Sequence, residues 1–304
     1  MVASPKKERR NISLQCCLSC VVACLSLFIA LSQTLKPNPA ELSTAYISDE
    51  LISFDALSEE VYPESQVRYE AYLNIFVRNA DLDQPLLQSK ENALPTHEFK
   101  HLQDCLRDHP MRHHNVNDDT TFNGTRGFLL SFNENGIEKM EKHDMFSCLK
   151  SYFRRYRLPN TNAWVLNMVW ADIPDYEREL TIQRHTDDAI MLNYTGSKKI
   201  MPYQTNVLYV FVPEDMQGGQ LEAWDYDAHP ATIMHGAQAS VTPVENRMAF
   251  FRGDAQHQVR SYKAPMKDTL RASLVLEQYD IPEEYRDLVL EWYWRDHQDS
   301  DMMM

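Results

Sequence analysis

Residues 206–224, NVLYVFVPEDMQGGQLEAW, contain the pattern that decides the fold. The run at 206–212 is rich in β-branched and aromatic residues and ends at Pro213, and Gly218-Gly219 precedes a second short run at 220–224. Short runs of this composition, separated by Pro and Gly, are typical of β-strands joined by turns. The stretch therefore predicts two strands with no helix between them.

The same pattern extends in both directions, from about Asn162 to Tyr279. Further strand-like runs lie at 127–132, 164–170, 247–251 and 272–276, with turn signals between them. Strands that follow one another without intervening helices favour a β-sandwich or jelly roll. Two helices are expected beside this core, at 137–156, where apolar residues recur at helical spacing, and at 282–297.

The N-terminal segment predicts a membrane anchor. Residues 1–10 hold four basic residues and one acidic residue, and the apolar run at 12–31 that follows has no charge. Twenty helical residues span about 30 Å, which is the thickness of a bilayer core, and the basic flank keeps the N-terminus cytoplasmic. A cleaved signal peptide, with Ala30-Leu31-Ser32 as its cleavage site, is the alternative. Both hypotheses send the chain into the secretory pathway, in the endoplasmic reticulum or Golgi if anchored.

Cysteine usage agrees with this division. Four of the six cysteines lie in the apolar run, which leaves Cys105 and Cys148 for the remainder. Two cysteines allow one disulfide, and the sequence leaves its formation open. Asn123-Gly124-Thr125 and Asn193-Tyr194-Thr195 are glycosylation sequons. The net charge of −14 argues against nucleic acid as a partner, since an acidic chain repels phosphate.

His185-Thr186-Asp187 is the motif with the clearest chemistry. Residues i and i+2 of a strand point to the same face, so this imidazole and carboxylate can converge on one ion. His257 follows a strand-like run and a polar turn, and could supply a third ligand. Two His and one carboxylate form a facial triad, which leaves positions open for a 2-oxo acid and dioxygen. Arg271, which shares a strand face with Ser273, could hold the far carboxylate by paired hydrogen bonds.

Other histidines are interpreted as structural. The stretch from His109 to His114 is expected to be a solvated loop, and a second H-x-D, His297-Gln298-Asp299, a charged surface tail. His229 and His235 lie outside the ordered pattern and are not expected to be ligands. Trp224 and Tyr209 are expected mainly to pack in the core.

The ordered set of these pieces, over about 120 of the 304 residues, resembles the Fe(II)/2-oxoglutarate-dependent dioxygenases of the prolyl 4-hydroxylase type. The resemblance implies a double-stranded β-helix with iron held by His185, Asp187 and His257. It also implies 2-oxoglutarate at Arg271 and Ser273, dioxygen as co-substrate, and ascorbate dependence. The implied reaction is hydroxylation of a peptide, protein or small-molecule substrate, with 2-oxoglutarate converted to succinate and carbon dioxide.

Three features depart from the family pattern. Arg271 stands where animal and plant prolyl 4-hydroxylases usually carry Lys, and Glu245-Asn246 replaces a usual Gly. The Tyr that commonly helps to bind 2-oxoglutarate cannot be placed, because residues 171–184 separate the preceding strand from His185. Prolyl specificity therefore stays open, as does the oligomeric state.

These observations predict a mainly β chain with flanking helices. The predicted order is a basic tail (1–11), an anchor (12–32), a stem (33–60), a mixed α/β support region (61–158), the jelly-roll dioxygenase core (159–280) and a C-terminal helix and tail (281–304). One rival function is a non-catalytic jelly-roll binding protein. The other is a luminal glycosyltransferase that uses Asp225-Tyr226-Asp227, although residues 160–225 lack the alternating helices that such a domain needs.

Overall fold

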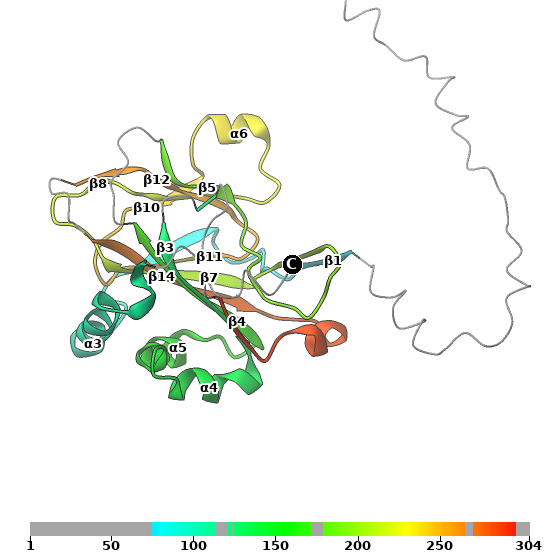
Figure 1. The fold of residues 1–304 in the computed structure, drawn as a ribbon. Coiled ribbons are helices and arrows are strands. Elements are labelled where there is room, and N and C mark those ends of the chain that lie inside the picture. The colour runs from blue at the N-terminus through cyan, green and yellow to red at the C-terminus, as the bar shows by residue number, and fades with distance from the viewer. Residues whose placement is uncertain (1–73, 114–120, 123–124, 172–178, 265–269, 296–304) are drawn as a thin grey trace, which may run out of the picture. The chain divides into compact units, whose positions relative to one another are not determined.

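The computed structural model describes residues 74–113, 121–122, 125–171, 179–264 and 270–295, and its largest element is a seven-stranded sheet (Figure 1). All neighbouring strands of this sheet are antiparallel. In spatial order the strands are β15 (Trp292–Trp294), β3 (Arg126–Asn133), β4 (Ala163–Ala171), β14 (Arg271–Tyr279), β7 (Gln204–Phe211), β11 (Met248–Arg252) and β2 (Leu87–Lys90).

A second, smaller sheet has four strands. Its antiparallel strands are, in order, β10 (Ala239–Val241), β9 (Leu221–Trp224), β12 (Gln256–Arg260) and β5 (Leu180–His185). Two short pairs flank the sheets, namely the parallel pair β1 (Ile75–Arg78) with β6 (Lys198–Met201) and the antiparallel pair β8 (Gln217–Gly218) with β13 (Tyr262–Lys263). The predicted mainly β fold with antiparallel sheets is confirmed.

The period of two along the central strands separates two environments. Trp164, Leu166 and Met168 of β4 belong to the core that packs against the helices. The alternate residues Asn167 and Val169 instead line a pocket between the two sheets. Because successive side chains of a strand point to opposite faces, one strand supplies both the hydrophobic core and the wall of the site.

Helices cover one face of the seven-stranded sheet and leave the other face to the smaller sheet. Helices α3, α4 and α5 lie together below the sheet in Figure 1, whereas α6 lies on the far side of the molecule. The helical elements are α3 (Thr96–Arg107), α4 (Ile137–Lys142), α5 (Lys150–Tyr156), α6 (Pro230–Met234) and the 3₁₀ turns η2 (Pro110–His113), η3 (Glu134–Gly136), η4 (Ser147–Leu149) and η5 (Glu283–Leu288).

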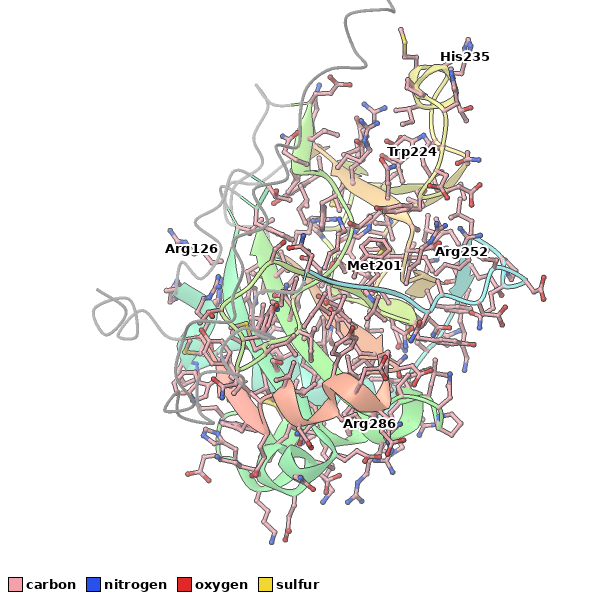
Figure 2. All side chains as sticks on the ribbon, turned by 90° about the vertical axis from the view of Figure 1, so that its right-hand side faces the viewer. Arg126, Met201, Trp224, His235, Arg252 and Arg286 are labelled. Atoms are coloured by element: carbon pink, nitrogen blue, oxygen red, sulfur yellow. A yellow bond between two sulfur atoms is a disulfide. The ribbon has the colours of Figure 1, made fainter. Side chains whose placement is uncertain are left out.

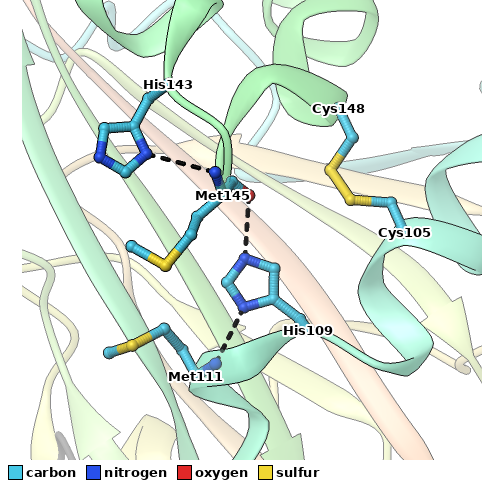
Figure 3. Close-up of a disulfide and its surroundings, with 6 residues drawn as sticks. All are labelled: Cys105, His109, Met111, His143, Met145 and Cys148. Atoms are coloured by element: carbon cyan, nitrogen blue, oxygen red, sulfur yellow. Dashed lines mark hydrogen bonds between the residues drawn. A yellow bond between two sulfur atoms is a disulfide. The ribbon is translucent and has the colours of Figure 1, made fainter.

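A disulfide joins the helices on this face. Cys105 of α3 is bonded to Cys148 of η4, which settles the pairing that the sequence left open (Figure 3). His109 lies beside it and is 4% exposed, so the expectation of a solvated loop is wrong for this residue. Its Nε2 is 3.0 Å from Met145 O, and its Nδ1 accepts the N–H of Met111. The ring therefore anchors the chain after α3 to the loop before η4 (Figure 3).

The helix predicted at 137–156 is interrupted. It forms as α4, η4 and α5, because His143 leaves the helical region with ψ of 130°. The His143 ring stacks on Trp292 at 5.6 Å, and its Nδ1 accepts the N–H of Met145. These tertiary contacts outweigh the local helical spacing.

The helix predicted at 282–297 is also wrong over the described residues. The chain makes only the short turn η5 and then strand β15, in which Trp292 pairs with Phe132 of β3. The aromatic residues of this segment fit a pleated, half-buried surface, and the free edge of β3 provides one.

Asn246, one of the two residues that replace the usual Gly of the family pattern, has a left-handed backbone conformation. Its φ is 59°, and its side-chain amide forms hydrogen bonds with both the N–H and the C=O of Leu94. Asn tolerates the left-handed region better than other side chains, so the turn survives the replacement.

Several predictions lie outside the described residues. These are the anchor at 12–32, the stem at 33–60, the sequon at Asn123 and the second H-x-D. None of the helices within the described part of the chain combines the length and apolar character that a membrane crossing requires.

Candidate functional site

A pocket lies between the two sheets and receives side chains from both. The larger sheet contributes residues of β4, β7, β11 and β14, and the smaller sheet contributes residues of β5, β9 and β12. The lining residues are Phe122, Asn167, Val169, Ile182, His185, Asp187, Thr205, Val207, Tyr209, Leu221, Phe251, His257, Val259, Arg271, Ser273, Val275 and Glu277. All five residues predicted from the sequence, His185, Asp187, His257, Arg271 and Ser273, therefore line one pocket.

An irregularity in the smaller sheet aims His185 into this pocket. His185 is paired with His257, and the next pair is Ile182 with Val259. Between these two pairs β5 advances by three residues and β12 by two, so β5 contains one extra residue. Plain alternation from the pocket-lining Ile182 would have turned His185 outward. The extra residue acts as a β-bulge, which reverses the alternation and places His185 beside His257.

Asp187 lies just beyond the end of β5 rather than within the strand. Its Oδ1 is 3.5 Å from Nε2 of His185 and 3.5 Å from Nε2 of His257. Its Oδ2 accepts a 2.8 Å hydrogen bond from the hydroxyl of Thr205 on β7. The larger sheet thus orients the carboxylate, while the smaller sheet supplies both imidazoles.

Backbone carbonyls determine which ring nitrogen each histidine offers. Nδ1 of His185 is 2.7 Å from Gln183 O, and Nδ1 of His257 is 3.2 Å from Ala255 O. A carbonyl only accepts, so the proton resides on Nδ1 and the lone pair of Nε2 faces Asp187. Metal-binding histidines are commonly oriented by a second hydrogen bond of this kind.

The electrostatics of the three groups are coupled. Burial lowers the pKa of His257 to about 4, against the attraction of Asp187, so the ring is neutral at physiological pH. Burial alone would raise the pKa of Asp187, but the His257 and His185 rings and the Thr205 hydroxyl hold it at about 2. A neutral His257 ring and an ionised Asp187 carboxylate are the charge states in which these groups bind a metal ion.

This donor set fits a divalent transition metal. One ligand atom from each of His185, Asp187 and His257 lies within 4.8 Å of the others. Phe122 packs edge-on against His185 and Phe251 against His257, with ring centroids 5.0 and 4.6 Å apart. The 2-His-1-carboxylate arrangement, shielded on two sides by aromatic rings, has the composition of a non-haem Fe(II) site.

Arg271 is a buried cation without a carboxylate partner in the described chain. It is 4% exposed, its Nη2 donates to Gly219 O at 3.2 Å, and its Nε makes no hydrogen bond to any described residue. Burial lowers the pKa of the guanidinium, although an arginine stays protonated in proteins. The guanidinium also lies over the ring of Tyr262, with Cζ 5.4 Å from the ring centroid. A buried charge is expensive unless it is paired, so an anion bound in the pocket would stabilise this group.

Tyr209 belongs to this end of the pocket, and the sequence argument assigned it to packing. Its hydroxyl is buried without a hydrogen-bond partner in the described residues, and it lies opposite Ser273 in the sheet register. Burial raises the pKa of Tyr209 to about 12, with the charge of Arg271 opposing the change. In the sequence, Tyr209 alternates with Thr205 and Val207, which also line the pocket. This spacing was the signal that could have placed Tyr209 on the pocket face of its strand.

The Gly218-Gly219 turn has a role beyond ending a strand. Gly219 has φ of 75°, a left-handed conformation that favours glycine, and in this conformation its carbonyl accepts the 3.2 Å hydrogen bond from Nη2 of Arg271.

The remaining candidates serve the structure. Asp225 pairs with Arg252 at 2.8 Å, and Asp227 with Arg78 at 2.9 Å, so the D-x-D carboxylates are engaged as ion pairs. Trp224 donates its indole N–H to Gly236 O beneath the loop that carries His235, outside the pocket lining (Figure 2). The interpretations of Trp224 as a packing residue and of His229 as a non-ligand are consistent with this, since His229 accepts the N–H of Ala231 at the start of α6.

Comparisons with known proteins give one curated match. No family model matches the chain. An uncharacterized PKHD-type hydroxylase of Synechocystis sp. is 30% identical over 97 residues, which are 30% of this chain and 32% of the relative. The chain therefore matches about a third of the length of this relative. The match supports the resemblance to hydroxylases of the prolyl 4-hydroxylase type.

Solved structures that align with parts of the chain include two prolyl hydroxylases. A prolyl-4-hydroxylase of Pseudomonas putida aligns with a TM-score of 0.40 and 15% identity, over 66% of this chain and 96% of that chain. A prolyl hydroxylase from Trichoplax adhaerens, in complex with a peptide fragment of the hypoxia inducible factor oxygen degradation domain, aligns with a TM-score of 0.38 and 13% identity, over 67% and 87%.

Proposed function

We propose that the chain is an Fe(II)/2-oxoglutarate-dependent oxygenase that hydroxylates its substrate. One observation carries the proposal, which is that the triad of His185, Asp187 and His257 shares a pocket with Arg271, a buried cation that has no carboxylate partner among the described residues. A metal triad alone fits many reactions. A triad together with a buried guanidinium fits a cosubstrate that chelates metal at one end and carries a carboxylate at the other.

Fe(II) at the triad would supply the activation of dioxygen, coupled to oxidative decarboxylation of 2-oxoglutarate to succinate and carbon dioxide. Arg271, with the hydroxyls of Tyr209 and Ser273 beside it, would bind the far carboxylate and fix the orientation of the cosubstrate. The charges of Fe(II), Asp187, 2-oxoglutarate and Arg271 cancel, as a dry pocket requires. Valines and Phe251 line the space between and would exclude water.

The substrate we propose is a prolyl or other side chain of a protein in the secretory pathway. The Cys105–Cys148 disulfide supports an oxidising compartment, where such bonds persist. The basic flank and apolar run at the N-terminus support anchoring in the endoplasmic reticulum or Golgi membrane. A small-molecule substrate is the alternative, and ascorbate is proposed as the reductant that keeps the iron in its ferrous state.

The proposal is tested by counting succinate. The full chain, supplied with Fe(II), ascorbate, oxygen and 2-oxoglutarate, should release succinate, faster with proline-containing peptides if prolyl groups are the substrate. His257→Ala should abolish this release, and Arg271→Ala should mainly raise the 2-oxoglutarate concentration that is needed. Glu222→Gln, which changes a carboxylate on the smaller sheet outside the pocket lining, is the matched control. A folded wild-type chain that released no succinate would favour a non-catalytic binding protein.

A further inference from the structure

Glu277 is a carboxyl in the pocket wall to which the proposed reaction gives no role. It is 2% exposed and lines the pocket. It lies on β14 at alternate spacing from Arg271, Ser273 and Val275, so all four side chains face the same way. Within the described lining, Asp187 and Glu277 are the only carboxyl side chains, and Asp187 belongs to the triad.

The sheet register places Glu277 at the metal end of the pocket. Its partner across β7 is Thr205, whose hydroxyl binds Asp187. Arg271 lies six residues away along the same strand, which corresponds to about 20 Å between the two Cα atoms. The two ends of the pocket therefore carry a cation and a carboxyl, with the triad near the carboxyl.

In its described hydrogen bonds, the carboxyl of Glu277 acts as an acceptor and not as a donor. The carboxyl accepts the hydroxyl of Tyr279 and the backbone N–H of Ala189. Burial, and then the negative charge of Asp187, raise the pKa of Glu277 well above its ordinary value, so the neutral acid is favoured. A neutral carboxyl has one O–H to donate, and no described residue accepts it.

Charge balance gives the same result. Fe(II), the triad, 2-oxoglutarate and Arg271 are already neutral together, and an ionised Glu277 would leave a net negative charge in a dry pocket. A neutral Glu277 needs no positively charged substrate group to balance it. The acceptor that its O–H requires must be a ligand at the metal end.

We infer that Glu277 binds the cosubstrate, donating its carboxyl O–H to the carboxylate of the 2-oxo acid that chelates the metal. This inference rests on the proposed function. It deepens that function by dividing recognition between two residues, so that Arg271 binds the far carboxylate and Glu277 the carboxylate next to the keto group. Tyr279 and Ala189 hold the side chain in place for this contact.

The test measures binding rather than turnover, with the full chain loaded with Zn(II) in place of iron. The wild type, Glu277→Leu, Glu277→Asp and Glu277→Gln are titrated with 2-oxoglutarate and with 4-oxopentanoate, which keeps the far carboxylate and the keto group but has a methyl group in place of the carboxylate next to the keto group. Glu277→Asp draws the carboxyl back by one methylene while keeping an acid, and it serves if Glu277→Leu does not fold. Glu222→Gln is the control.

We expect Glu277→Leu and Glu277→Asp to weaken 2-oxoglutarate binding by about tenfold or more, because a hydrogen bond to a charged group is lost. Glu277→Gln should bind nearly as the wild type does, since its amide N–H replaces the O–H, and 4-oxopentanoate binding should be the same in all variants. Unchanged 2-oxoglutarate binding in both Leu and Asp variants, or equal weakening of 4-oxopentanoate binding, would overturn the inference alone. A wild type that binds no 2-oxoglutarate would overturn the proposed function as well.

Discussion

Single hydrogen bonds determine what each residue of the pocket can do. The carbonyls of Gln183 and Ala255 orient the rings of His185 and His257, and Thr205 orients Asp187 from the opposite sheet. The same pocket contains groups whose partners are missing from the described chain, at Arg271 and Tyr209. The satisfied groups form the candidate metal site, and the unsatisfied groups lie where we propose that the cosubstrate binds.

Replacing Thr205 tests the orientation of Asp187. Thr205→Val keeps the shape of the side chain but removes the 2.8 Å hydrogen bond to Asp187 Oδ2. We expect metal affinity to fall by about 10- to 100-fold, which is typical for the loss of an outer-shell partner. Competition between the protein and a chelating dye for Zn(II) measures the change. Thr205→Ser, which keeps the hydroxyl, should bind as the wild type does, and equal affinity in all three chains would contradict the assignment.

The raised pKa of Glu277 predicts a pH dependence of stability. The folded chain holds a proton there that the unfolded chain releases above about pH 4.5. The wild type should therefore lose stability relative to Glu277→Gln as the pH rises from there toward the folded pKa, by about 1.4 kcal/mol per pH unit in that window. Urea unfolding of both metal-free chains between about pH 5 and pH 8 measures this. A difference that stayed constant over that range would mean that Glu277 is ionised in the folded state.

The residues with sequence signatures were predictable, and those defined only by their surroundings were not. His185, Asp187, His257 and Arg271 stand in an ordered pattern of residue types that chemistry recognises. Tyr209 and Glu277 stand in strands where an aromatic or charged residue has many uses. Their roles depend on which face of the strand meets the pocket, and therefore on the register.

At the scale of elements, strands were predicted better than helices. Residues 164–170 and 272–276 form central strands that are covered on both faces. Their local composition and their tertiary contacts therefore both favour a strand. The breaks at His143 and in the C-terminal segment arise from contacts with distant residues, such as the stacking of His143 on Trp292. The bulge before His185 also depends on β12, and a single strand carries no sign of it.

The disulfide predicts a measurable contribution to stability at this scale. Cys105 and Cys148 are separated by 43 residues and tie α3 to η4. Replacing both by Ser should lower the free energy of unfolding by about 2–4 kcal/mol, because the unfolded chain regains the freedom of the loop. Urea unfolding with and without reductant measures the effect. Reductant should destabilise the wild type by the same amount and leave the double variant unchanged, and a reductant-insensitive wild type would be evidence against the bond.

At the scale of the whole molecule, the two sheets contribute different residues to the site. The smaller sheet provides the imidazoles, and the larger sheet provides Arg271, Ser273 and Tyr209 through β14 and β7. The mainly β architecture followed from strand composition, while the pairing order of the strands required the folded chain. The sequence interpretation of an N-terminal anchor concerns residues 12–32 and stays a prediction.

The proposed secretory location predicts glycosylation. Asn193 of the sequon Asn193-Tyr194-Thr195 is exposed and lies outside the strands. Expressed in cells with a secretory pathway, the full chain should lose apparent mass on treatment with a glycosidase, and Asn193→Gln should reduce that loss. Cys105 and Cys148 should also resist alkylation until they are reduced. A chain without glycans, whose two cysteines alkylate freely, would contradict a luminal location.

The central claim is that a 2-oxo acid binds to iron held by the triad and to Arg271 at once. The most direct test adds Fe(II) to the metal-free full chain without oxygen, titrates in 2-oxoglutarate, and records the visible spectrum. The account predicts a charge-transfer band that saturates with 2-oxoglutarate, disappears in His257→Ala, and requires far more 2-oxoglutarate in Arg271→Ala. A folded wild-type chain that binds Fe(II) but shows no band at any 2-oxoglutarate concentration would contradict it.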